Sequence, residues 1–239
     1  MSDGRNAEPT TVIVLGMHRS GTSCLAGCLE EAGLYLGAVN TKAPHNAKGN
    51  RENLAIMSLH DAVLAASGGS WNVPPEVVVW SEEHRARQAG IIGTYPADGV
   101  WGFKDPRTVL TLDGWLEVLP RVRCVGTFRH PVAVARSLAA RKRIPAKDAF
   151  SLWLQYNRRL LDYQRRLDFD LIGFDWPVER YRQQLANMCA GLDLAAPTQG
   201  ASFFDSALRR QEGSDWEDLP PDCEATYRAL EEIASRSEL

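Results

Sequence analysis

A short apolar run that ends in a glycine-hinged loop constrains the fold more than any other feature of the sequence. Residues Thr11–Leu15 are rich in β-branched side chains and predict a buried strand. Gly16 and Gly21 bracket the loop that follows, and apolar residues then recur at helical spacing as far as Gly33. A buried strand that leads directly into a helix is typical of the first half of a β-α-β unit.

The rest of the chain repeats this alternation. Further strands are expected at residues 100–104, 122–128 and 171–175, and helices at residues 53–66, 82–92, 131–143, 146–167, 177–192 and 223–235. We therefore predict one α/β domain with a mainly parallel central sheet of about four to five strands, flanked by helices. Residues 1–10 are expected to be a loose segment and residues 11–239 the domain, in keeping with a length of 239 residues.

Composition excludes several other classes. The net charge of −3 gives no general argument for nucleic-acid binding. No apolar run approaches the roughly 20 residues of a membrane span, and the first residues lack the apolar part of a secretory signal. The five Cys include no C-x-x-C pair, which favours small core residues in a reducing compartment. We therefore expect a cytoplasmic protein, and the oligomeric state is left open.

The loop Gly16–Ser23 has the spacing G-x-x-x-x-G-x-[ST] of a P-loop. Backbone N–H groups and the positive end of the following helix suit such a loop to an anion. Nucleotide triphosphatases need a Lys at the position of Thr22, where it holds the β- and γ-phosphates. With Thr22 there, and Arg19 inside the loop, we expect a site for a terminal phosphate-like group rather than for NTP hydrolysis.

A second motif follows the strand at residues 122–128. Arg129 stands at the strand end, Pro131 suits the first turn of a helix, and Ser137 lies about two turns further along that helix. Residues 121–147 hold eight basic side chains and no acidic one. This block predicts either a local anion site or a solvated helix face.

Together, the loop and the second motif resemble the sulfotransferases, a family that binds 3′-phosphoadenosine 5′-phosphosulfate (PAPS) on a P-loop-type fold. The resemblance runs from about residue 11 to residue 211. It implies that Arg129 and Ser137 hold the 3′-phosphate of PAPS. It also implies that the 5′-phosphosulfate is bound by the loop residues Arg19, Ser20, Gly21, Thr22 and Ser23.

The sequence departs from the family pattern in two places. His130 stands where the family usually has Asn, and Val134 where many members have Arg. The 3′-phosphate would then depend more on other cations, such as Arg209 or Arg210. Those two lie in a late Leu-Arg-Arg segment that resembles a loop closing on the 3′-phosphate, although a plain basic helix end remains an equal alternative.

Two further segments supply candidate catalytic residues. Lys104 ends a strand, in a Lys-Asp-Pro sequence that in the family helps to hold the transferring sulfuryl group. Its charge could stabilise a developing anion, or it could be a surface Lys. Asp105 and Arg107 beside it could form a structural ion pair or contact the substrate.

Glu52 resembles the family's general base, and the neighbouring Arg51 could keep its carboxylate ionised. Glu52 could instead serve only the first turn of a helix. His45 is the main rival for the base, and His18, His60 and Asp105 are weaker ones.

The resemblance implies a sulfotransferase that moves a sulfuryl group from PAPS to a hydroxyl acceptor, such as a glycan, a natural product or another small molecule, without a metal. The alternatives are a P-loop nucleotide kinase or NTPase and a non-catalytic PAPS-binding module. Residues 37–99 and 144–170 are expected to shape the acceptor pocket. The aromatic residues in or beside them are Trp71, Trp80, Trp101, Trp153 and Tyr156.

Overall fold

The computed structural model describes residues 8–42, 48–142, 144–197, 203 and 219–236. Four strands form one sheet in the order β2-β1-β3-β4, and every neighbouring pair is parallel. The strands are β1 (Thr10–Leu15), β2 (Val100–Lys104), β3 (Val122–Phe128) and β4 (Leu171–Gly173). The predicted α/β fold with a parallel central sheet is therefore confirmed.

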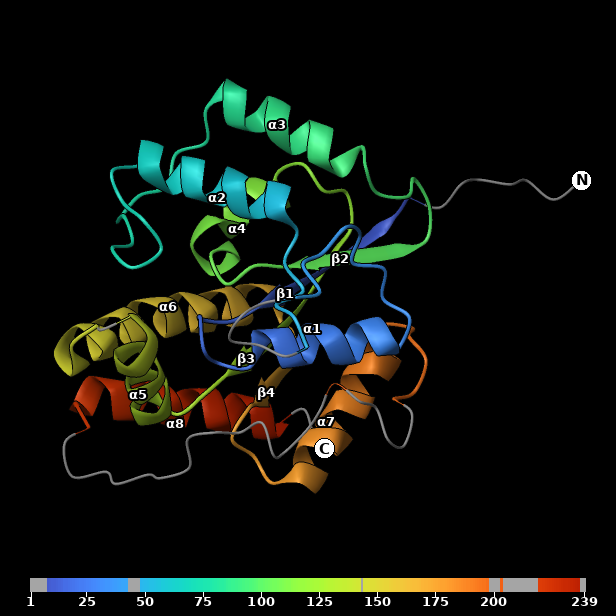
Figure 1. Cartoon of the computed structure of the whole chain (residues 1–239). Coiled ribbons are helices and arrows are strands. Elements are labelled where there is room, and N and C mark those ends of the chain that lie inside the picture. Colours follow the sequence, from blue (N-terminus) through green and yellow to red (C-terminus); the bar gives the residue numbers. More distant parts are fainter. Residues whose placement is uncertain (1–7, 43–47, 143, 198–202, 204–218, 237–239) are drawn as a thin grey trace, which may run out of the picture.

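Helices surround this sheet (Figure 1). Helix α1 contacts β1, β2 and β3, while α6 contacts β3 and the neighbouring helices α4, α5 and α8. Helices α2, α3 and α4 are grouped at one end of the molecule in Figure 1. The bounds are α1 (Thr22–Glu31), α2 (Leu54–Ala66), α3 (Glu82–Ile92), α4 (Thr108–Leu116), α5 (Pro131–Lys142), α6 (Ala146–Leu167), α7 (Val178–Gly191) and α8 (Pro221–Arg236).

The pattern of apolar residues explains these elements. Residues 12–15 of β1 are completely buried, as expected for a central parallel strand that is covered on both faces. The buried residues of α6 include Leu152, Tyr156 and Leu160, which recur every four positions on one face of the helix. None of the described helices is long and apolar enough to cross a membrane.

The largest differences between the structure and the sequence expectations concern two elements. Strand β4 ends at Gly173 instead of Asp175, because the chain turns there and Trp176 N donates to the Gly173 carbonyl. In this turn the Asp175 side chain binds the end of β3. Helix α4 was not predicted. Seven of its nine residues are buried, so it lacks the alternation of polar and apolar faces that reveals a surface helix.

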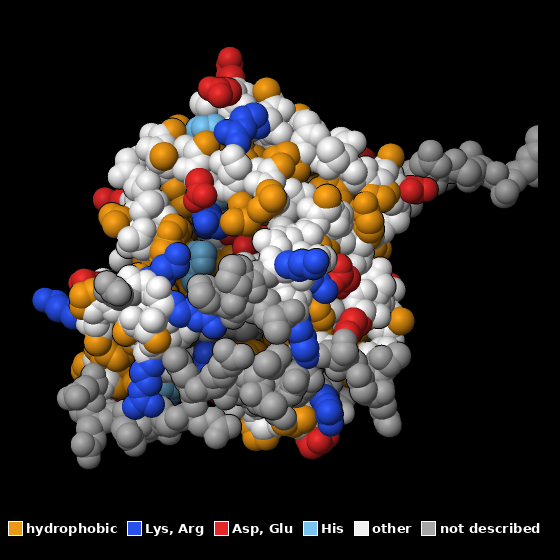
Figure 2. Space-filling model, viewed as in Figure 1, with side chains coloured by type: hydrophobic (Ala, Val, Ile, Leu, Met, Phe, Trp, Pro, Cys, Tyr) orange, Lys and Arg blue, Asp and Glu red, His pale blue; other side chains and the backbone are white. Residues whose placement is uncertain are grey.

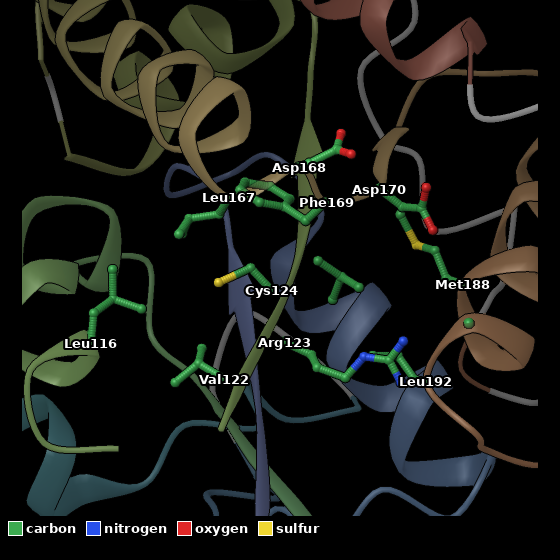
Figure 3. Close-up of a pocket in the computed structure, with 12 residues that line it drawn as sticks. Leu116, Val122, Arg123, Cys124, Leu167, Asp168, Phe169, Asp170, Met188 and Leu192 are labelled. Atoms are coloured by element: carbon green, nitrogen blue, oxygen red, sulfur yellow. The ribbon is translucent and has the colours of Figure 1, made fainter. Parts of the chain in front are cut away.

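The short β4 leaves a pocket beside the first half of β3 (Figure 3). This pocket of about 300 Å³ is lined by Val122 and Cys124 of β3, by the 167–170 turn and by the end of α7. Burial raises the pKa of the Cys124 thiol to about 12, so the thiol stays protonated. The pocket borders the amino end of β3, at the opposite end of the sheet from the Gly16–Ser23 loop.

Candidate active site

The Gly16–Ser23 loop turns tightly from β1 into α1. Gly16 and Gly21 have φ angles of 146° and 86°, which side-chain-bearing residues rarely adopt. A Cβ atom at Gly21 would lie 2.1 Å from the Phe174 ring, and one at Gly16 would lie 2.5 Å from the Thr127 carbonyl oxygen. The loop thus combines close packing with the N-terminus of α1, an arrangement that suits an anion.

Arg19 joins this loop to helix α5. Its Nε donates a hydrogen bond of 2.9 Å to Oγ of Ser137, a residue 118 positions later in the chain. Burial, together with nearby Arg141 and Arg129, lowers the pKa of Arg19 to about 10, so it remains charged at neutral pH. Arg19 and Ser137, which the sulfotransferase resemblance assigned to the same PAPS molecule, are therefore in direct contact.

Arg129 is fixed at the end of β3 by Asp175. Its Nε lies 3.0 Å from Asp175 Oδ1, and the backbone N–H of His130 donates to Oδ2 at 2.9 Å. The Arg129 carbonyl also accepts a hydrogen bond from Trp153 Nε1. From the sequence, Asp175 was expected among the functional residues at the carboxyl ends of the strands, but its pairing with Arg129 was not predicted. The last predicted strand ends at Asp175, and side chains at the carboxyl ends of parallel strands meet at one edge of the sheet.

Lys104 and Glu52 form a buried ion pair beside the loop. Lys104 Nζ lies 2.6 Å from Glu52 Oε1 and 3.2 Å from Ser23 Oγ. The Lys104 side chain is completely buried, and that of Glu52 is 12% exposed. Burial lowers the pKa of Lys104, although the Glu52 carboxylate opposes this effect. A surface role for Lys104 is therefore excluded.

The position of Glu52 is set by the short segment before α2. Its carbonyl accepts a hydrogen bond from Asn40 N, and Asn53 caps α2 by accepting from Ala55 N at 2.9 Å. Glu52 therefore precedes the cap, and the first turn of α2 contains no acidic residue. The first-turn interpretation of Glu52 is wrong. Arg51 was expected beside the Glu52 carboxylate, but its Nε binds Glu30 at 2.5 Å.

Asp105 belongs to a buried network under the loop. Trp115 Nε1 donates to His60 Nε2, which leaves the His60 proton on Nδ1, 3.1 Å from Asp105 Oδ2. Arg107 donates to Asp105 Oδ1 at 2.9 Å. Although burial opposes it, these partners hold the pKa of Asp105 well below its usual range. Asp105 and His60 are completely buried, so this network supports the turn from β2 to α4.

Three predicted site residues, His45, Arg209 and Arg210, lie outside the described residues. The others gather at the carboxyl ends of β1, β2 and β3. Figure 2 shows Lys and Arg side chains across the middle of the face in view.

Known proteins were compared with this chain at the levels of sequence and structure. No protein-family model matches it, and no curated protein matches it. Solved structures do match. The sulfotransferase domain from the curacin biosynthetic pathway is 14% identical and has a TM-score of 0.55, with 93% of this chain and 98% of that domain covered.

The fold is that of a sulfotransferase. A second structure agrees: sulfotransferase STF9 from Mycobacterium avium has a TM-score of 0.52 and 16% identity, covering 98% of this chain and 78% of that protein. Within the sulfotransferase fold of the present chain, the Gly16–Ser23 loop receives Lys104 from the β2 side and Ser137 from the α5 side.

Proposed function

We propose that the chain is an enzyme that transfers a sulfuryl group from PAPS to a hydroxyl acceptor. The observation that carries this proposal is the position of Lys104, 3.2 Å from Ser23 of the loop and 2.6 Å from the Glu52 carboxylate. One cation thereby links an anion-binding loop to a potential base. Sulfuryl transfer to a hydroxyl needs these three elements together.

The residues of the loop and of β3 fit the donor. Gly16 and Gly21 leave the loop without side chains where close contacts already exist, so its backbone N–H groups can approach a 5′-phosphosulfate. Arg19 and Ser137 would bind the donor between the loop and α5, and Arg129 would contact its 3′-phosphate. Bound PAPS supplies an activated sulfuryl group on a phosphate leaving group.

The acceptor side is formed by Glu52 and Lys104. Glu52 accepts the proton of the acceptor hydroxyl, and the acceptor oxygen forms a bond to sulfur as the bond from sulfur to the phosphate oxygen breaks. Lys104 and Arg19 stabilise the negative charge on the sulfuryl and phosphate oxygens. Lys104 must turn from Glu52 toward these oxygens during this step, which frees the carboxylate to take the proton.

The experiment is an assay of PAPS turnover against a panel of phenols, sugars and aliphatic alcohols. We expect adenosine 3′,5′-bisphosphate to be released only with certain acceptors, together with an equal amount of sulfated product. Binding of the bisphosphate without turnover would instead identify a non-catalytic binding module. Magnesium-dependent turnover of ATP or GTP would identify a kinase or NTPase, which Thr22 in the loop disfavours.

A further inference from the structure

The His18 side chain, which the proposed transfer step does not use, faces an aromatic surface next to the loop. Its ring lies 4.7 Å from the Trp71 ring, centre to centre, with a tilt of 53° between the planes. The His18 and Tyr156 rings are also packed edge to face, with 6.0 Å between their centres and 76° between their planes. His18 directly precedes Arg19, so this surface begins beside the proposed transfer site.

Trp71 is held firmly in this surface. Tyr156, a buried residue of α6, donates a hydrogen bond of 2.8 Å from its hydroxyl to the Trp71 carbonyl. Lys142, at the end of α5, places its Nζ 5.9 Å from the centre of the Trp71 ring. Trp71 is partly exposed, whereas Trp101 and Trp153 belong to the core. It can therefore offer indole surface to a ligand.

The chemistry of His18 is that of a neutral hydrogen-bonding group. Burial and the nearby Arg107 lower the pKa of His18 to about 3, against the opposing effect of Asp105. At neutral pH the ring thus carries one N–H and one lone pair. Nε2 is buried and has no hydrogen-bond partner among the described residues. A buried lone pair is tolerated better than a buried N–H, so the proton belongs on Nδ1.

We propose that His18 and Trp71 form one wall of the acceptor pocket and bind a hydroxylated ring. The apolar face of the ring lies on Trp71, and a second oxygen of the acceptor, not the reacting one, accepts a hydrogen bond from Nδ1 of His18. This inference rests on the proposed function. His18 selects the acceptor and does not remove its proton, because its Nδ1 already carries a proton and its Nε2 is buried.

Aromatic and sugar rings both present an apolar face and neighbouring hydroxyls. Two probes, one of each kind, therefore determine which type of ring binds. Catechol and methyl β-D-glucopyranoside are titrated separately into the bisphosphate-loaded protein, with ¹⁵N-labelled histidine followed by NMR. We expect one of them to bind and to shift the ring-nitrogen signals of His18. His18→Phe should weaken this binding about 10-fold, because the donor is lost. His18→Asn, which keeps an N–H donor, should recover part of the affinity.

Two further variants test the ring surface. Trp71→Phe reduces the indole surface and should weaken probe binding several-fold. Trp80→Phe is the matched control, since Trp80 is also partly exposed but packs against Gly114 of α4. It should leave probe binding unchanged.

The outcomes separate this inference from the proposed function. A wild-type protein that does not bind the bisphosphate would contradict the proposed function itself. If the bisphosphate binds but neither probe does, the proposed wall is wrong. The same holds if a probe binds equally well to the wild type, His18→Phe and Trp71→Phe. In Trp71→Phe and Trp80→Phe, bisphosphate affinity should stay within about threefold of the wild type, because neither residue belongs to the proposed donor site.

Discussion

Nζ of Lys104 lies 2.6 Å from Oε1 of Glu52, and no part of the Lys104 side chain reaches solvent. Removing one member of such a pair leaves the other as an uncompensated buried charge, which costs far more than the pair itself contributes. The contribution of the pair to the free energy of unfolding can therefore be measured without any ligand.

Lys104→Met should lower the free energy of unfolding by about 3–5 kcal/mol. The double variant Lys104→Met/Glu52→Gln should be less destabilised than the sum of the two single variants, because no charge is left unpaired. Urea unfolding of the four proteins measures this difference. Strictly additive effects would show that the two side chains do not interact in solution.

Glu52→Gln should reduce turnover by about 10²–10⁴-fold, since the amide keeps the shape of the carboxylate but cannot accept the proton. Bisphosphate affinity should remain within about threefold. Glu117→Gln, a change from carboxylate to amide at an exposed residue after α4, is the control and should keep full activity. If Glu52→Gln stays active while His45→Ala is inactive, His45 is the base.

Arg129→Ala should reduce the preference for adenosine 3′,5′-bisphosphate over AMP by about 10-fold or more, because a charge-assisted contact to the 3′-phosphate is lost. Calorimetry of both nucleotides measures this preference. Arg123→Ala is a matched control on the same strand, since Arg123 pairs with Asp193 at the amino end of the sheet. Equal affinity of the wild type for the two nucleotides would remove Arg129 from 3′-phosphate recognition.

Acid should destabilise the wild type more than His18→Asn. The folded-state pKa of His18 is about 3, below its ordinary value of 6.5, so only the unfolded chain binds a proton between these values. The wild type therefore loses up to about 1.4 kcal/mol of stability per pH unit from pH 6.5 down to pH 3. The variant lacks this loss. Parallel stability curves for the two proteins between pH 7 and pH 4 would contradict the burial of a neutral His18.

Gly21→Ala should destabilise the fold by more than about 1 kcal/mol and weaken bisphosphate binding, because it adds a methyl group 2.1 Å from Phe174 at a positive φ. Gly68→Ala provides the comparison. Gly68 also has a positive φ, of 79°, but nothing lies within 4 Å of its added Cβ. The Gly68→Ala variant should therefore be destabilised by backbone strain but should keep its affinity for the bisphosphate. Urea unfolding and calorimetry separate the two effects.

The sequence predicted those parts of the protein in which a local pattern decides the structure. Strands β2 and β3 and helices α3 and α6 begin and end where apolar spacing, Gly and Pro indicate. The Gly16–Ser23 loop was recognisable for the same reason. Helix α4 was missed because a buried helix has no polar face, so burial by other elements erases its periodicity.

The partners of the site residues were harder to predict. Arg51 is adjacent to Glu52 in sequence but binds Glu30, while Lys104, 52 positions away, supplies the partner of Glu52. Asp175 binds Arg129 for a similar reason, since β3 and β4 are neighbours in the sheet although far apart in the chain. Such pairings follow from the strand order, which sequence periodicity does not specify.

Because β1 lies inside the sheet, between β2 and β3, the proposed acceptor contacts and the proposed nucleotide contacts fall on opposite sides of it. The Glu52 segment and Lys104, which are proposed to contact the hydroxyl acceptor, lie on the β2 side. Arg129 and Ser137, which are proposed to contact the nucleotide, lie on the β3 side. A sulfotransferase organised as proposed could acquire new acceptors through changes between α1 and β2, while the Gly16–Ser23 loop and the β3 side stay the same. In an engineered chimera, segments between α1 and β2 exchanged between proteins of this fold should transfer acceptor preference and leave donor affinity intact.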